Sequence, residues 1–256
     1  MKILAIGDVV GAIGSSFLRS KLPSLKKSEG IDLVIANGEN SADGNGITPD
    51  SADFLFSSGA DVLTGGNHSF RRREMYDYYD QSPNILRPAN FPEGTTPGKG
   101  AVIYDMGRYQ VGIINLMGCL FLKSLDDPFR KADALLKELG TKITIVDFHA
   151  EATAEKRALG YYLDGRVSAV FGTHTHVQTA DEQILENGTG YITDVGMTGP
   201  LHSVLGVTAE LAISNFRDKL PVKFETAQGK CCMDCIIFDI DEKSGRTRSL
   251  KRLRIV

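Results

Sequence analysis

The chain has 256 residues, of which 42% are hydrophobic and 24% charged, so it is long enough to bury a complete core. Its 29 Lys and Arg against 32 Asp and Glu give a net charge of −3, which argues against general DNA binding and binding to an anionic membrane. No signal-peptide core and no apolar run of about 18 residues occurs, so we expect a cytoplasmic protein. No linker or low-complexity stretch interrupts the chain, which favours a single domain over residues 1–256.

Short apolar runs recur along the first two-thirds of the chain, with helix-like segments between them. The runs cover residues 2–7, 32–36, 60–64, 109–116, 142–148, 167–172 and 190–195. Runs that are apolar at successive positions are typical of strands in a sheet covered on both faces. This part of the chain therefore predicts strands joined by β-α-β crossovers.

Several of the segments between these apolar runs carry residues that are typical of helix ends. Thr48 and Asp127 are capping residues that each precede a proline, while Gly59 and Gly140 stand where these two helices should end. A later helix is expected at 207–219. Antiparallel strands are expected after it, at 222–227, 231–240 and 248–256. The pattern predicts an α/β domain with a mixed sheet arrangement.

The cysteines are too few for a disulfide scaffold of this length. Cys231, Cys232 and Cys235 are spaced like a metal or redox motif, but they lie in an apolar β-type run and lack a fourth ligand nearby. We interpret them as small buried hydrophobic residues.

Polar side chains stand at the ends of five apolar runs. They are Asp8, Glu39 and Asn40, Asn67 and His68, His149, and His174 and His176. A single such residue is commonly a turn or cap residue, but a succession of five strand ends is not explained that way. Because ligands of open α/β sheets bind at the carboxyl ends of strands, we expect these side chains to meet in one cleft. The fifth histidine, His202, follows no strand and is expected in a surface loop.

The donor types predict a metal centre. Seven of these residues supply oxygen or nitrogen ligands without a thiolate: Asp8, Glu39, Asn40, Asn67, His149, His174 and His176. One octahedral ion has six positions and must leave some open, so a single ion cannot use all seven. Two ions about 3.5 to 4 Å apart can, if one carboxylate bridges them, and Glu39 stands between the other strand ends in sequence. Carboxylate, amide and imidazole ligands suit manganese, iron or zinc, and the two amides favour manganese or iron.

His68 is assigned a different role. Neighbouring residues in an extended chain point to opposite sides, so if Asn67 binds a metal ion, His68 should remain free over the cleft. An imidazole there can donate a proton to a leaving oxygen near neutral pH. The alternative is that His68 only orders its loop.

The motifs Gly7-Asp8, Gly38-Glu39-Asn40, Gly66-Asn67-His68, His149 and Gly172-Thr173-His174-Thr175-His176 resemble those of the calcineurin-like metallophosphoesterases. Two departures, Asp8-Val9-Val10 for D-x-H and Glu39-Asn40 for the usual acidic motif, resemble the YmdB-type subgroup of bacterial phosphodiesterases. So do the segments 87–95, 126–133, 147–156, 172–181 and 191–200.

The resemblance implies a four-layer α-β-β-α sandwich with mixed sheets and a binuclear iron or manganese centre. It implies hydrolysis of cyclic nucleotides such as 2',3'-cyclic AMP, by attack of a metal-bridging hydroxide. One ion would be held by Asp8, Glu39, Asn40 and His176, and the other by Glu39, Asn67, His149 and His174. The run Arg71-Arg72-Arg73 departs from the subgroup and leaves the fine substrate preference open.

Two other functions remain open on the sequence. A regulatory or RNA-associated protein could keep the metals for structure and hold a nucleotide, although His68, which is not needed as a ligand, favours catalysis. A metal-dependent amidohydrolase also gathers histidines and acids at strand ends, but the asparagine ligands and the G-N-H motif favour a phosphate substrate. Whether RNA ends are cleaved, and whether the chain forms a homo-oligomer, is not determined by the sequence.

Overall fold

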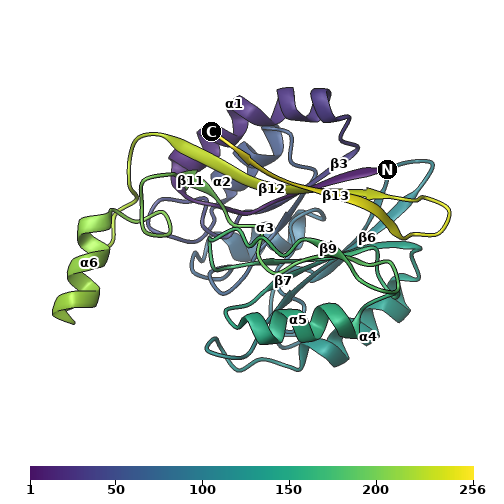
Figure 1. Cartoon of the computed structure of the whole chain (residues 1–256). Coiled ribbons are helices and arrows are strands. Elements are labelled where there is room, and N and C mark those ends of the chain that lie inside the picture. The colour runs from purple at the N-terminus through teal and green to yellow at the C-terminus, as the bar shows by residue number, and fades with distance from the viewer.

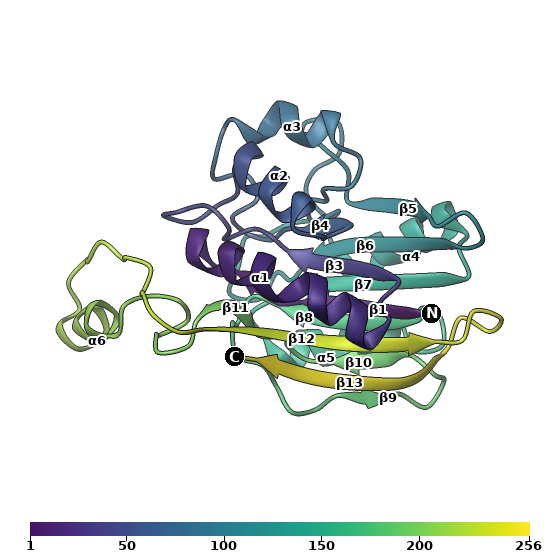
Figure 2. The same cartoon turned by 90° about the horizontal axis from the view of Figure 1, so that it is seen from above.

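The computed structural model describes residues 1–256 and contains two mixed sheets packed face to face (Figures 1 and 2). The first sheet consists of β1 (Lys2–Ile6), β2 (Asp8–Val9), β3 (Leu33–Asn37), β4 (Val62–Thr64), β11 (Met197–Pro200), β12 (Cys231–Ile240) and β13 (Thr247–Ile255). Its order is β2-β11-β12-β1-β3-β4, and β13 also pairs with β12. Strands β1, β3 and β4 are parallel, whereas β12 is antiparallel to β1, β11 and β13.

The second sheet has the order β5-β6-β7-β8-β10-β9. Its strands are β5 (Ala101–Asp105), β6 (Gln110–Met117), β7 (Ile143–His149), β8 (Ala169–Thr173), β9 (Gln183–Ile184) and β10 (Gly190–Ile192). Strands β6, β7, β8 and β10 are parallel to their neighbours in this series, as the crossover pattern predicted.

Helices cover the outer faces of both sheets. Those on the first sheet are α1 (Gly11–Glu29), α2 (Pro49–Ser57) and α3 (Met75–Gln81), and those on the second are α4 (Pro128–Leu139) and α5 (Thr153–Tyr162). A last helix, α6 (Ala209–Asp218), projects from the body (Figure 1). The expected four-layer α-β-β-α arrangement is therefore confirmed.

The alternation of side chains along the strands explains these layers. In β1, Leu4 and Ile6 join the core beneath α1, while Ile3 and Ala5 join the core between the two sheets. Successive side chains of a strand point to opposite faces, so a strand that is apolar at every position has both faces covered. The predicted buried strands are therefore explained by cores on both sides.

The predicted helix ends agree closely with the structure. The Thr48 side chain accepts a hydrogen bond from the backbone of Ser51 at the start of α2, and Asp127 caps α4 in the same way. Gly140 ends α4 in the left-handed conformation, with φ of 58°, which glycine adopts without strain.

One predicted strand is wrong. Residues 222–227 form no strand and contribute only an isolated bridge between Val207 and Thr226. They belong to the excursion that leaves the body with α6 between β11 and β12 (Figure 2). Their backbone hydrogen bonds go to residues 206–208 of the same excursion and not to a sheet strand. The other two predicted strands pair as β12 and β13, and the cysteines of β12 are buried and free, as expected.

No helix has the length and apolar character that a membrane span requires.

Candidate metal centre

The polar side chains predicted at the strand ends come together where the parallel strands of both sheets end. Asp8 comes after β1 as the first residue of β2, Glu39 and Asn40 follow β3, and Asn67 and His68 follow β4. In the second sheet, His149 is the last residue of β7, and His174 and His176 follow β8. The centre thus lies between the two sheets and takes residues from both.

Glu39 occupies the middle of the group. Its carboxylate is almost fully buried and lies 3.3 Å from Nε2 of His149. It accepts hydrogen bonds from the side chain of Asn40 at 3.2 Å and from the backbone N–H of His68 at 3.0 Å. A carboxylate in contact with both halves of a ligand set can bridge two cations.

One half of the group surrounds Asp8. Nε2 of His176 lies 3.6 Å from Oδ1 of Asp8 and 3.3 Å from the Asn40 side-chain nitrogen. The other carboxylate oxygen, Oδ2, accepts a hydrogen bond from the backbone N–H of His174 at 3.0 Å. Asp8 therefore places the loop after β8 as well as facing one of its histidines.

The other half surrounds His149, which is fully buried. Its Nε2 lies 2.9 Å from Oδ1 of Asn67 and 3.1 Å from Nδ1 of His174. Ligand atoms of Glu39, His149 and His174 all lie within 4.8 Å of one another. All seven predicted donors are thus joined in one continuous set of contacts.

The charges of this group are balanced inside the protein. Burial raises the pKa of Glu39, but the charge and hydrogen bond of His149 outweigh it and hold that pKa well below its ordinary value. Burial also raises the pKa of Asp8, and His176 reverses the effect, so the pKa of Asp8 is lowered. Burial lowers the pKa of His176, yet the facing carboxylate of Asp8 raises it to about 9. His149 and His176, whose pKa values are raised, therefore compensate the two buried carboxylates.

The residues fit divalent cations. Oδ1 of Asp8 is buried and has no hydrogen-bond partner, although buried polar atoms are almost always paired. Bound cations would supply that partner and would replace the protons that now compensate the carboxylates. The donors are carboxylate, amide and imidazole, the ligand types that suit manganese, iron and zinc.

Backbone geometry at the ligand loop is unusual. His174 and His176 have φ of 103° and 61°, a region that side chains other than glycine rarely adopt and that costs on the order of 1–3 kcal/mol per residue. The left-handed turns let Nδ1 of His174 and Nε2 of His176 face different halves of the group. The strained backbone of this loop therefore points the His174 and His176 side chains toward different halves of the group.

Gly66 explains how tightly the loop after β4 approaches the centre. A Cβ atom at this position would lie 2.2 Å from the His149 ring and 2.5 Å from Oε2 of Glu39. Only glycine fits there. The spacing of the Gly66-Asn67-His68 motif thus has a steric cause.

His68 does not stand free over the cleft, and the premise of an extended chain is wrong. Residues 67–70 form a turn, so Asn67 and His68 both face the group. Nδ1 of His68 lies 2.8 Å from Oδ1 of Asn40 and 3.4 Å from Oε1 of Glu39. The side chain is about a quarter exposed (25%), which leaves part of the ring accessible to a bound molecule.

A layer of buried polar residues supports His149, and the sequence analysis missed it. The hydroxyl of Thr173 lies 2.9 Å from Nδ1 of His149 and donates to Asp147 at 2.7 Å. The side chain of Asn37 contacts Asp147 and Thr173, each at 3.3 Å. Burial raises the pKa of Asp147 to about 7. Asp147 precedes His149 by two positions and so shares its face of β7, a signal that the sequence does contain.

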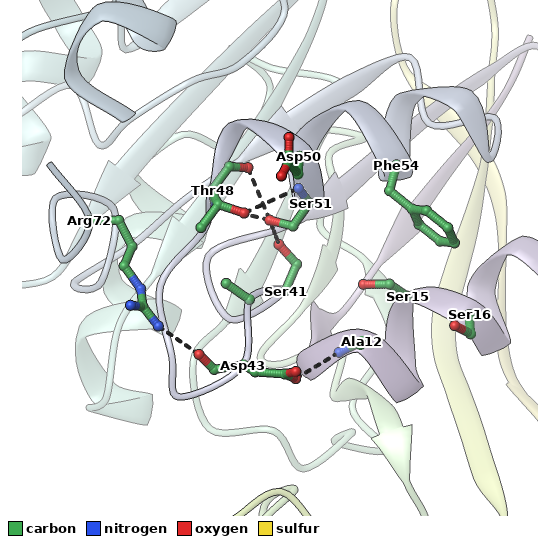
Figure 3. Close-up of a pocket in the computed structure, with 11 residues that line it drawn as sticks. Ala12, Ser15, Ser16, Ser41, Asp43, Thr48, Asp50, Ser51, Phe54 and Arg72 are labelled. Atoms are coloured by element: carbon green, nitrogen blue, oxygen red, sulfur yellow. Dashed lines mark hydrogen bonds between the residues drawn. The ribbon is translucent and has the colours of Figure 1, made fainter. Parts of the chain in front are cut away.

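The three consecutive arginines separate in the structure. Arg72 lines a cavity of about 380 Å³ and donates a hydrogen bond to the backbone carbonyl of Asp43 (Figure 3). It donates a second one to the carbonyl of Asn45. Arg72 therefore orders the 43–46 loop, while Arg71 and Arg73 are exposed. His202 is exposed in a loop, as predicted.

Comparison with known proteins assigns the chain to a family. The family model for "YmdB-like protein" matches residues 4–253. The chain belongs to the YmdB-like family. A 2',3'-cyclic-nucleotide 2'-phosphodiesterase from Bacillus subtilis (strain 168) is 49% identical over 100% of this chain and 97% of that protein.

Solved structures agree with this assignment. The structure described as a novel phosphatase from Mycoplasma pneumoniae matches with a TM-score of 0.94 and 32% identity, over 100% of this chain and 93% of that one. A putative 5'-nucleotidase from Staphylococcus aureus matches with a TM-score of 0.64 at 15% identity, over 100% of this chain and 55% of that one, which shows a shared fold. This member of the YmdB-like family is a phosphoester hydrolase.

Proposed function

We propose that residues 1–256 act as a single metallophosphoesterase domain that hydrolyses 2',3'-cyclic nucleotides such as 2',3'-cyclic AMP, with two iron or manganese ions as cofactors. The observation that carries the proposal is the set of seven donors centred on Glu39, four of them buried, in which Oδ1 of Asp8 has no hydrogen bond. The Bacillus relative, named for this activity and 49% identical over the whole chain, supports the substrate class.

The ligand assignment follows the two halves of the group. Asp8, Asn40 and His176 would hold one ion, Asn67, His149 and His174 would hold the other, and Glu39 would bridge them. When bound, such ions supply charge neutralisation on the phosphate and a water molecule that is nucleophilic at neutral pH.

His68 is the proposed general acid. Its ring is partly exposed and is oriented by Oδ1 of Asn40 at 2.8 Å. An imidazole in this position can donate a proton to the ribose oxygen that leaves the phosphorus.

A turnover assay tests the proposal. Purified protein is treated with a chelator, reloaded with manganese, iron or calcium, and given 2',3'-cyclic AMP and 3',5'-cyclic AMP. We expect chelation to abolish hydrolysis of the 2',3' substrate and manganese or iron to restore it better than calcium, whose larger and more flexible shell positions a nucleophile poorly. Turnover that survives exhaustive chelation would overturn the metal mechanism.

The alternative of a metal-containing regulatory or RNA-associated nucleotide-binding protein predicts a different result. Such a protein would bind the cyclic nucleotide without consuming it. Equilibrium binding combined with no turnover on any reloaded sample would favour that alternative. RNA ends with a 2',3'-cyclic phosphate remain candidate substrates because they carry the same reacting group.

A further inference from the structure

A second pocket, of about 400 Å³, adjoins the candidate metal centre on the side of His68. Its walls are Asn67, His68, Arg71, Leu122 and Lys123. Two of these residues belong to the proposed catalytic group, and two of the other three are cations. The pocket is therefore positioned to contact a molecule whose reacting phosphate lies at the metals.

The two cations lie in loops that follow strands of different sheets. Arg71 lies in the loop that follows β4, and Lys123 lies in the segment between β6 and α4. The start of that segment is held by Glu155 of α5, which accepts hydrogen bonds from the backbone N–H groups of Cys119 at 2.9 Å and Leu120 at 3.4 Å. The pocket is thus formed by two anchored loops at the junction of the sheets.

Neither cation makes a polar contact within the protein. Arg71 and Lys123 have no ion pair and no side-chain hydrogen bond within the chain, whereas the adjacent Arg72 donates hydrogen bonds to two loop carbonyls. Two uncompensated cations that line one pocket favour an anionic ligand, and the guanidinium of arginine is suited to bidentate contact with phosphate.

A cyclic mononucleotide leaves these cations without a partner. Its cyclic phosphate is its single anionic group, and in the proposed function that group lies at the metal centre. The one free hydroxyl of the ribose is on C5', and this position becomes anionic once it is phosphorylated. The pocket chemistry is thus matched by a nucleotide with a phosphate at each end of the ribose.

We propose that the pocket binds a second phosphate of the substrate, on the 5' oxygen of the nucleoside whose 2',3'-cyclic phosphate is hydrolysed. This inference rests on the proposed function. The second phosphate can belong to a free 5'-phosphorylated nucleotide or to the linkage that joins the last two nucleotides of an RNA fragment. Arg71 and Lys123 are then specificity-determining residues, and they act on binding of the substrate.

The test compares three substrates on the manganese-loaded enzyme: adenosine 2',3'-cyclic phosphate, its 5'-phosphorylated form, and the dinucleotide ApA ending in a 2',3'-cyclic phosphate. For each, kcat and KM are measured for the unaltered protein, for Arg71→Ala, Lys123→Ala and the double variant, and for Arg71→Lys. Arg73→Ala is the matched control, because Arg73 is exposed in the same loop but does not line the pocket. Circular dichroism of each variant checks the fold.

We expect kcat/KM of the unaltered protein to be roughly ten- to a hundredfold higher for a substrate with the 5' phosphate, the usual contribution of one or two charge-assisted hydrogen bonds. The double variant should bring this ratio close to one, mainly through KM, and Arg71→Lys should keep part of it. Arg73→Ala should keep the full ratio. Preference for the dinucleotide identifies RNA ends as the source of the phosphate, and preference for the 5'-phosphorylated nucleotide alone identifies a free nucleotide.

Three results would overturn the inference. Equal kcat/KM for all three substrates on the unaltered protein shows that no second phosphate is bound, while the proposed function stands. An unchanged substrate ratio in the double variant shows that other residues bind this phosphate. If no cyclic phosphate is hydrolysed at all, the proposed function fails and the inference fails with it.

Discussion

Lys156 and Asp194 form an ion pair in which Nζ lies 2.5 Å from Oδ2 and both side chains are buried. Lys156 also donates to the carbonyl of Thr173 at 2.7 Å, and Oδ2 of Asp194 accepts from the backbone N–H of Thr175 at 3.0 Å. The pair therefore fixes the chain on both sides of His174. It supports the strained loop that carries two of the candidate ligands.

Replacing Lys156 by Met should destabilise the protein strongly. The methionine fills similar space but leaves the Asp194 carboxylate buried without its cation, which typically costs about 3–5 kcal/mol of unfolding free energy. Urea denaturation measures the loss. Arg217→Ala, which removes an exposed ion pair with Asp218, is the control and should leave the midpoint unchanged. A Lys156→Met midpoint equal to the control would show that the pair contributes nothing to stability.

Replacing Glu39 by Gln should lower metal occupancy and activity together. The change keeps the size of the side chain but removes the negative charge that two cations would share. Metal content by elemental analysis and turnover of 2',3'-cyclic AMP are measured on one preparation. Full activity with two ions still bound would contradict the bridging role of Glu39.

Replacing His68 by Ala should separate metal binding from catalysis. If His68 is the general acid, two metal ions stay bound while turnover of a cyclic nucleotide falls by roughly 10²- to 10⁴-fold. A nitrophenyl phosphodiester should lose less, because its leaving group needs little protonation. Loss of an ion, or an equal defect on both substrates, would show that His68 acts through the metals or through phosphate positioning.

The ion pair of His176 with Asp8 predicts a pH dependence of the metal-free protein. The pKa of His176 is raised to about 9 in the fold, above the value of about 6.5 for an unperturbed histidine. The stability that its protonated ring contributes is therefore complete below about pH 6.5 and is lost as the pH rises through about 9. Metal binding displaces the same proton, so metal affinity should rise over this range.

Thermal denaturation of chelator-treated protein between pH 6 and pH 9.5 checks this expectation. The unaltered protein should lose melting temperature over this range more steeply than the His176→Asn variant, which has no proton to lose. Identical slopes for the two proteins would show that His176 is not protonated in the metal-free fold.

The sequence by itself determined nine of the thirteen strands, the helix starts at Thr48 and Asp127, and the location of the donors. Runs such as 2–7 and 142–148 are largely apolar at successive positions, so both faces of these strands must be buried. The capping residues Thr48 and Asp127 bind backbone groups only two or three residues away. The donors could be recognised because the parallel strands of each sheet bring their carboxyl ends to the same edge. Capping depends on residues that are close together in the chain, and strand burial depends on the two-residue repeat of a strand. Both can therefore be recognised in the sequence.

Only the tertiary structure decided the contacts between residues that are far apart in the chain. Residues 222–227 look like a strand, but their backbone hydrogen bonds go to residues 206–208 of the same excursion and not to a sheet strand. The turn at 67–70 brings His68 against Asn40 instead of leaving it free. Arg71, Arg72 and Arg73 have identical side chains, and their surroundings alone distinguish them. The Lys156–Asp194 pair joins residues 38 positions apart, and only the packing of α5 against β8 and the 194 loop brings the two charges together.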